Sequence, residues 1–382
     1  MEPNRHRLQT AHRQMYPPHE TTEAQPVKRV FISDCEGPIS KNDNAYEATA
    51  RFVPKGDKLF TRISKYDDVL ADVIKKPGYN AGNTLKLILP FLKAYNVTDE
   101  HLKQFSAENL LLIAGSKNTL EHVRRLSDSF IVSTSYEHYI RALCDELNFP
   151  FEKTYCTQMS LDKYVVSSRE TSQLRELAIE IAQMPIITIP PNAKSLEDFS
   201  EQDRETVMQL YSIFWEKISR MGAGIVFKIT KPVGGRQKAE AVKDAVDRSG
   251  VQLSDVLYVG DSITDVEAFK LVTENGGLTV SFNGNEYAVR NAELAVLAEN
   301  NTVLAVIADL FSKQEKEKVL QVLGEFSYEN LKQTPVAKLI LEQLSAKLPK
   351  LQIVTPQNME TLVRESRDFR KKVRGEAVGR LG

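Results

Sequence analysis

The sequence predicts an α/β protein in which helices cover a parallel sheet. Short apolar runs of strand type alternate along the chain with stretches of helical periodicity. The strand-type runs occupy 27–33, 129–133, 255–260 and 278–282. Acidic or hydroxyl side chains lie at the ends of three of these runs, and a parallel sheet gathers such groups in one crevice. Both observations favour a layered fold with its functional site at the carboxyl ends of the strands.

The composition is that of an ordinary globular protein. Hydrophobic residues make up 42% and charged residues 26% of 382 residues, enough for roughly two or three domains. The formal net charge is -1, which indicates neither a nucleic-acid partner nor a membrane surface. The chain has no run of about 18 apolar residues, so we expect no membrane insertion. Three cysteines without a disulfide or zinc pattern favour a reducing compartment, and we predict a cytoplasmic location.

The first part of the chain is interpreted as a polar tail, a strand and a largely helical segment. Residues 1–26 lack apolar periodicity, and we expect them to be disordered. Order begins with the strand at 27–33, which closes on a Gly-Pro turn. Residues 46–125 are mainly helical, and Pro90 is expected to break the apolar stretch "TLKLILPFLKAY".

The second part resumes the alternation of strands and helices around a helical insertion. The strand at 129–133 is followed by a helix at about 137–147, and residues 161–225 form the insertion. Predicted helices at about 238–248 and 265–274 flank the later strands. Residues 301–382 are mostly helical and end in the basic segment "RDFRKKVRGEAVGRLG".

Three polar side chains at strand ends suit phosphoryl transfer. Asp34, Ser133 and Asp261 lie at the carboxyl ends of separate predicted strands, so they can meet in one crevice. Phosphoryl transfer needs an in-line nucleophile, a divalent cation and positive charge around the phosphate oxygens. Asp34 can supply the attacking carboxylate. Asp34, Asp261 and Asp265 can supply hard oxygen ligands, and we predict that they bind Mg²⁺.

Other side chains can bind the phosphate and move protons. Lys238 opens a predicted helix after the glycine-rich loop "VGGRQ", where backbone can approach a phosphate, and its charge can neutralise the phosphate and the nucleophile. Ser133 can donate its hydroxyl to a phosphate oxygen, and Thr134 and Ser135 offer neighbouring hydroxyls. Glu36 can protonate the leaving oxygen and then activate a water molecule.

Four segments resemble motifs of the haloacid dehalogenase (HAD) superfamily. They are "FISDCEG" at 31–37, "FIVSTS" at 130–135, "RQKAEAV" at 236–242 and "YVGDSITDVEAF" at 258–269. The resemblance implies that the nucleophile is Asp34, the acid/base is Glu36, the phosphate is bound by Ser133 and Lys238, and the metal-binding acids are Asp261 and Asp265. It also implies that the backbone carbonyl of Glu36 binds the metal. The last segment, with "FNGNEYAV" at 282–289, is similar to the phosphoserine-phosphatase-like branch.

The resemblance also implies an organisation for the core of the chain, and it does not extend to the insertion or the C-terminal region. It implies a three-layer, Rossmann-like core with a parallel sheet, formed by 27–45, 126–160 and 226–300. The remaining segments are a helical cap at 46–125, a helical insertion at 161–225 and a helical C-terminal extension at 301–382. The whole chain also resembles an archaeal HAD group assigned as subunit R of an energy-converting hydrogenase, although the sequence contains no hydrogenase ligand motif.

We therefore predict a Mg²⁺-dependent phosphatase that hydrolyses a small phosphorylated metabolite through an aspartyl phosphate. Two positions depart from the family pattern, Glu36 for the usual Asp and Pro38 after the glycine. Glu36 suggests an alternative, phosphotransfer to an acceptor alcohol. The extra C-terminal helices suggest another, a non-catalytic regulatory or scaffold subunit with a protein partner at this region. The basic segment at 367–382 is interpreted as a solvated end.

Cys35, beside the proposed nucleophile, is interpreted as a packing residue. A cysteine-dependent phosphatase needs an arginine six residues after the cysteine, and position 41 is a lysine. Dehalogenase chemistry is disfavoured because it needs neither a metal site nor the acid/base at Glu36. A membrane pump is excluded by the missing membrane spans.

Overall fold

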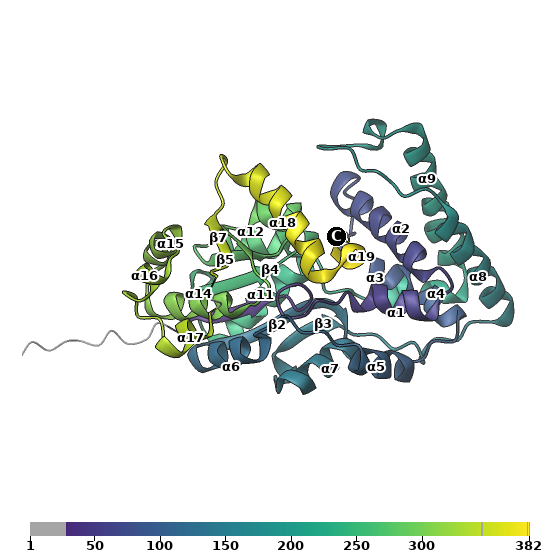
Figure 1. Cartoon of the computed structure of the whole chain (residues 1–382). Coiled ribbons are helices and arrows are strands. Elements are labelled where there is room, and N and C mark those ends of the chain that lie inside the picture. Colours follow the sequence, from purple (N-terminus) through teal and green to yellow (C-terminus); the bar gives the residue numbers. More distant parts are fainter. Residues whose placement is uncertain (1–27, 345–346, 380, 382) are drawn as a thin grey trace, which may run out of the picture.

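The computed structural model describes residues 28–344, 347–379 and 381, so the tail predicted at 1–26 lies outside the described residues. The described chain forms a seven-stranded sheet with the order β3-β2-β1-β4-β5-β6-β7 (Figure 1). Strands β1 to β6 are parallel, and β7 pairs antiparallel with β6. The strands are β1 Val30–Ser33, β2 Asp128–Tyr136, β3 Thr154–Thr157, β4 Val256–Gly260, β5 Leu278–Phe282, β6 Leu294–Leu297 and β7 Lys350–Ile353. The predicted α/β class with a parallel sheet is confirmed.

Helices cover both faces of this sheet and make it the middle of three layers. One face carries α6 Ser116–Leu126, α7 Glu137–Leu147 and α14 Thr302–Lys313, and the other carries α11 Arg236–Ser249, α12 Val266–Glu274 and α13 Glu286–Asn291. Side chains of β1 alternate between the layers, with Val30 and Ile32 on one face and Phe31 on the other. This alternation is what a strand buried on both faces requires.

The four strands expected from the sequence are all present as β1, β2, β4 and β5. Strands β3 and β6 have four residues each and were not predicted. Strand β1 is equally short, but it ends the longer strand-type run that begins at residue 27 of the sequence. Strand β7 lies in the segment 301–382, which was expected to be mostly helical. It is a half-buried edge strand, so it lacks the continuous apolar run by which central strands are recognised.

A second body of the molecule is helical and has its own apolar core. Residues from the segment before β2 and from the insertion after β3 belong to one hydrophobic cluster. Its helices are α1 Asn44–Phe52, α2 Gly56–Asp68, α3 Thr84–Leu87, α4 Leu89–Ala94, α5 Asp99–Glu108, α8 Ser168–Gln183, α9 Glu201–Tyr211 and α10 Val226–Ile229. The helical stretch is broken between α3 and α4, and Pro90 lies in the first turn of α4. Helix α2 faces the sheet body across the site described below.

The C-terminal helices lie on the sheet body and reach toward the helical body. They are α15 Lys316–Gly324, α16 Tyr328–Leu331, α17 Lys338–Gln343, α18 Met359–Arg374 and α19 Glu376–Gly379. Leu362 and Val363 of α18 pack with Val289 of α13. Beyond α19, Leu381 joins the apolar cluster of the helical body. Figure 1 shows α18 and α19, in yellow, between the two bodies.

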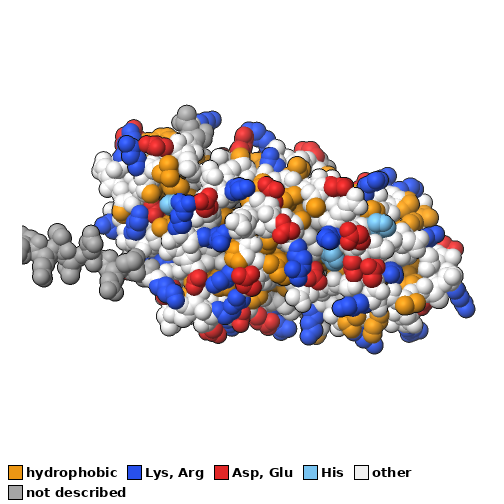
Figure 2. Space-filling model, turned by 90° about the horizontal axis from the view of Figure 1, so that it is seen from below, with side chains coloured by type: hydrophobic (Ala, Val, Ile, Leu, Met, Phe, Trp, Pro, Cys, Tyr) orange, Lys and Arg blue, Asp and Glu red, His pale blue; other side chains and the backbone are white. Residues whose placement is uncertain are grey.

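The surface carries charges of both signs. Figure 2 shows Lys and Arg side chains interspersed with Asp and Glu side chains on the face that it draws. None of the helices in the described part of the chain combines the length and the apolar character needed to cross a bilayer.

Candidate active site

Asp34 lies directly after the central strand β1, where the neighbouring strands bring other functional groups to it. Ser33 is aligned with Ile131 of β2 and with Val259 of β4. The Asp34 N–H donates to the Val259 carbonyl at 2.8 Å, so the first residue of the turn still follows the sheet. Ser133 and Asp261 therefore stand on either side of Asp34. This convergence is the one expected from the strand ends.

Three carboxylates and one lysine form a buried cluster at this point. Asp34, Asp261 and Asp265 each have a carboxylate oxygen within 4.8 Å of the others. The Lys238 ammonium lies 2.6 Å from Oδ2 of Asp34 and 2.8 Å from Oδ1 of Asp265. The Lys238 side chain is completely buried, so its charge acts on these two carboxylates with little screening by water.

Asp265 organises the cluster by accepting hydrogen bonds at both of its carboxylate oxygens, among them one from the Ser262 hydroxyl to Oδ2 at 3.4 Å. Its Oδ1 accepts from the Tyr258 hydroxyl at 2.7 Å and from Lys238, and its Oδ2 accepts the backbone N–H groups of Asp261 and Ser262 at 3.0 Å. A Cβ at Gly260 would lie 2.4 Å from Cγ of Asp265, so only glycine leaves room for this side chain.

Burial and neighbouring charge oppose each other at the nucleophile position. Burial, together with the Asp265 and Asp261 carboxylates, raises the pKa of Asp34 to about 7 against the lowering effect of the Lys238 ammonium. At Lys238, burial lowers the pKa, but Asp265 and Asp34 raise it more, so the lysine stays charged. The cluster therefore carries more negative charge than Lys238 alone offsets.

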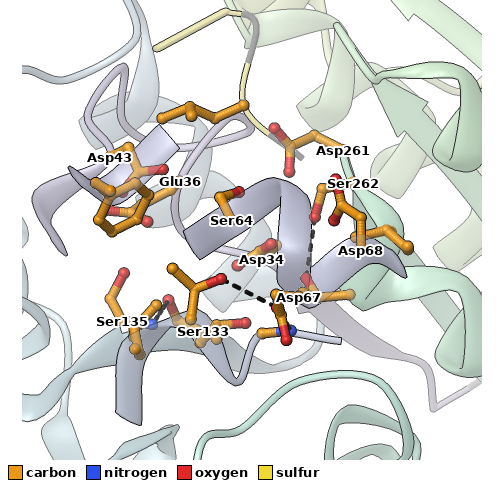
Figure 3. Close-up of a pocket in the computed structure, with 18 of the residues that line it drawn as sticks. Asp34, Glu36, Asp43, Ser64, Asp67, Asp68, Ser133, Ser135, Asp261 and Ser262 are labelled. Carbon is orange, nitrogen blue, oxygen red and sulfur yellow. Dashed lines mark hydrogen bonds between the residues drawn. The ribbon is translucent and has the colours of Figure 1, made fainter. Parts of the chain in front are cut away.

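The hydroxyls at the end of β2 face the same cavity. The register between β2 and β3 shifts between Val132 and Tyr136, which releases Ser133, Thr134 and Ser135 from a regular ladder. The Ser135 N–H donates to Ser133 Oγ at 3.2 Å, and Figure 3 shows both serines on the same side of Asp34. The Thr134 hydroxyl is buried and has no hydrogen-bond partner within the described residues. A phosphate oxygen bound in the cavity would give this hydroxyl the acceptor that it lacks.

The side chain of Glu36 reaches the N-terminus of helix α1 and lies beside Asp43 (Figure 3). Its Oε1 accepts the Asn44 N–H at 2.7 Å. Burial, followed by the Asp43 carboxylate, raises the pKa of Glu36 well above its ordinary value. A carboxyl group with a raised pKa can hold a proton near neutral pH and donate it.

A cavity of about 100 Å³ joins these groups to helix α2. Figure 3 shows Ser64, Asp67 and Asp68 of α2 on the wall facing Asp34. Asp67 is held by the Tyr79 hydroxyl at 2.6 Å and by the Gly82 N–H at 2.9 Å. These residues were not predicted, because their place depends on how the helical body packs on the sheet.

The glycine-rich loop before Lys238 packs against the helical body. We expected its glycines to allow a close approach to phosphate. A Cβ at Gly234 would lie 2.3 Å from the carbonyl oxygen of Ala81, which belongs to the loop before α3. Gly234 therefore makes room for the backbone of the helical body. Lys238, four residues later, reaches the carboxylates of Asp34 and Asp265.

Two arginines of α18 complete the wall of the cavity, and the sequence interpretation of this segment as a solvated end was wrong. Arg370 donates through Nη1 to Oδ2 of Asp261, and Nη1 of Arg374 lies 3.0 Å from the same oxygen. Both side chains are 4% exposed. A usable signal existed, because Val363, Ser366, Arg370 and Arg374 recur at three- and four-residue spacing on one face of the helix.

The donor set fits a hard divalent cation. Asp34 and Asp261 supply carboxylate oxygens in one cluster, as Mg²⁺ prefers. A Cβ at Gly37 would lie 2.1 Å from Oδ2 of Asp261, so the peptide that carries the Glu36 carbonyl passes close to that carboxylate. Both arginines bond to Oδ2, and no hydrogen bond from the described residues reaches Oδ1 of Asp261. Asp265 lies in the cluster too, but both of its oxygens already accept at least two hydrogen bonds.

Similarity to solved structures at 24% identity or less shows the fold and no more. A gene product from Archaeoglobus fulgidus is similar with a TM-score of 0.75 and 24% identity, over 93% of this chain and 99% of that chain. A phosphoserine phosphatase in its apo form is similar with a TM-score of 0.41 and 10% identity, over 73% of this chain and 98% of that one. A phospho-aspartyl intermediate analogue of phosphoserine phosphatase has a TM-score of 0.41 and 12% identity, over 70% and 92%. No protein-family model and no curated protein matches the sequence.

Proposed function

We propose that this chain is a HAD-type, Mg²⁺-dependent phosphohydrolase that cleaves a small phosphomonoester with Asp34 as the nucleophile. The observation that carries the proposal is the buried cluster of Asp34, Asp261, Asp265 and Lys238 next to the hydroxyls at the end of β2. It combines a nucleophile, oxygen ligands for a cation and donors for phosphate, which phosphoryl transfer requires together.

In the first step, an oxygen of Asp34 attacks the phosphorus atom and the ester P–O bond breaks. The electron pair of that bond stays on the leaving oxygen, which takes a proton from Glu36 and departs as the alcohol. Lys238 stays bonded to Oδ2 of Asp34 and limits the negative charge that the incoming phosphate meets. The product on the protein is an aspartyl phosphate.

In the second step, a water molecule attacks the phosphorus atom of the aspartyl phosphate. Glu36, now ionised, takes a proton from this water, the bond between phosphorus and Asp34 breaks, and inorganic phosphate leaves. Ser133 and Thr134 donate hydrogen bonds to the phosphate oxygens in both steps. When bound to Asp34, Asp261 and the Glu36 carbonyl, Mg²⁺ supplies a Lewis acid that offsets charge on the phosphoryl group. Asp265 holds Lys238 and the backbone of Asp261 in place.

The dimensions of the cavity support a small substrate. Its volume of about 100 Å³ is below the roughly 300–1,000 Å³ of sites that enclose drug-sized ligands. A phosphate group with a short substituent matches this space better than a nucleotide does. A bulkier substrate requires helix α2 or helix α18 to move.

The decisive experiment measures phosphate release from a generic aryl phosphate with Mg²⁺ present. We expect Asp34→Asn to lower the rate by at least about a thousandfold, because the substitution removes the nucleophile and keeps its size. EDTA should remove the activity of the unmodified chain. Full turnover in Asp34→Asn would refute the assignment of the nucleophile.

The same assay separates the alternatives. With an acceptor alcohol in the reaction, identification of the products by mass distinguishes hydrolysis from phosphotransfer. The regulatory or scaffold alternative predicts no turnover, and no thermal shift with Mg²⁺ or with tungstate as a phosphate mimic.

A further inference from the structure

Helix α18 places two positive charges on the carboxylate that a cation needs. Arg370 and Arg374 both bond to Oδ2 of Asp261, and their side chains are 4% exposed. Asp261 therefore already has counter-ions in the structure, and they come from a helix outside the sheet and outside the helical body.

The remaining donors show what holds each arginine. Arg374 bonds through Nε to the Lys41 carbonyl at 3.0 Å and through Nη2 to the Asn42 carbonyl, so it is anchored to the loop after Asp34 as well. Arg370 has a buried Nε without a partner within the described residues, and its Nη2 reaches only the Leu381 carbonyl at 3.4 Å. The charged bond to Asp261 is thus the main contact that offsets the burial of Arg370.

We infer that Arg370 and Arg374 are internal counter-ions of Asp261 that compete with a divalent cation, so that helix α18 sets the cation affinity of the site. The inference rests on the proposed function for the presence of a cation site. A positive charge beside a buried carboxylate repels an incoming cation, and the repulsion is strong where water screens little. By linkage, a cation that binds Asp261 weakens the hold of α18 on the site by the same factor.

The test is calorimetric titration of the metal-free full chain with Mg²⁺, which needs no turnover. We expect Arg370→Gln and Arg374→Gln each to bind Mg²⁺ at least about tenfold more tightly than the unmodified chain, because each removes one repelling charge. Arg367→Gln is the matched control, since Arg367 lies on the exposed face of the same helix with 59% of its side chain accessible. The control should change the affinity by less than about twofold.

Conservative variants separate charge from packing. Arg370→Lys and Arg374→Lys keep the positive charge and lose the planar fork, so we expect their affinity for Mg²⁺ to stay near that of the unmodified chain. A purely structural role would make the Lys and Gln variants behave alike. If Arg370→Gln does not fold, the Arg374 pair of variants carries the same comparison.

The inference is overturned if Arg370→Gln and Arg374→Gln bind Mg²⁺ no more tightly than Arg367→Gln, which includes the case in which no variant binds it. Failure of the proposed function has a different signature, namely phosphate release that survives Asp34→Asn. Tighter Mg²⁺ binding in the two Gln variants without Asp34-dependent turnover would retain the inference and refute the phosphohydrolase.

Discussion

Lys238 and the pair Arg370 and Arg374 neutralise one acidic cluster from two different parts of the fold. Lys238 lies in the first turn of α11, against the sheet, and contacts Asp34 and Asp265 at 2.6 and 2.8 Å. The arginines lie on α18, which packs on α13, and both contact Asp261. One lysine thus serves two carboxylates, whereas two arginines share one oxygen.

This difference separates a fixed charge from an adjustable one. Loss of Lys238 leaves two buried carboxylates without their common partner, while loss of one arginine leaves the other on Asp261. The lysine therefore belongs to the framework of the site, and the arginines belong to the part that can respond to a cation. The following variants test that division, from the largest expected effect to the smallest.

Lys238→Met tests the fixed charge. We expect it to lower the free energy of unfolding of the metal-free chain by about 3–5 kcal/mol, because removing one partner of a buried ion pair leaves its carboxylates uncompensated. Urea unfolding measures the loss. Lys243→Met, at an exposed position of the same helix, is the control, and equal losses in the two variants would refute the view of Lys238 as a buried counter-ion.

Gly37→Ala tests what fixes Asp261 besides the arginines. Gly37 has a φ of +107°, and a Cβ there would lie 2.1 Å from Oδ2 of Asp261. We expect a loss of about 1–3 kcal/mol in the free energy of unfolding and weaker pairing of Asp261 with the arginines. Gly78→Ala is the matched control, because Gly78 has a φ of +74° and no atom within 4 Å. Similar losses of unfolding free energy in Gly37→Ala and Gly78→Ala would mean that the arginines, and not the turn at Gly37, fix the position of Asp261.

The pH dependence of stability tests how completely Lys238 offsets the burial of Asp34. Burial raises the pKa of Asp34 from 3.8 to about 7, so the folded chain binds more protons than the unfolded chain between these values. Stability therefore falls as the pH rises through this range. Between pH 6 and pH 8, we expect the unmodified chain to lose about 1 kcal/mol more than Asp34→Asn does, as measured by urea unfolding without divalent cations. Equal losses would show that the lysine offsets the burial fully.

The sequence predicted the part of the site that local patterns determine. Asp34, Ser133 and Asp261 each lie at the end of an apolar run, and a parallel sheet brings such positions together without further information. The four central strands were predicted for the same reason. Lys238 was predicted from its place at the start of a helix, and Gly234 before it makes room for the carbonyl of Ala81.

The arginines and the wall formed by α2 could not be predicted in the same way. Basic residues near one end of a sequence are usually solvated, and Arg370 and Arg374 differ from that pattern only through their alignment with Val363 and Ser366 on one helix face. The place of Asp67 in the cavity wall depends on how the helical body packs on the sheet body, and the local periodicity of the sequence does not show this packing. Long-range packing therefore decided the residues that sequence reasoning missed.

The bonds from Arg374 to the carbonyls of Lys41 and Asn42 join residues 333 and 332 positions apart in the chain. Because synthesis proceeds from the N-terminus, Asp34 and Asp261 leave the ribosome long before Arg374 does. A sheet that assembles before α18 is made holds carboxylates without their arginine partners. The charge balance described above is therefore complete only when α18 lies against the sheet body.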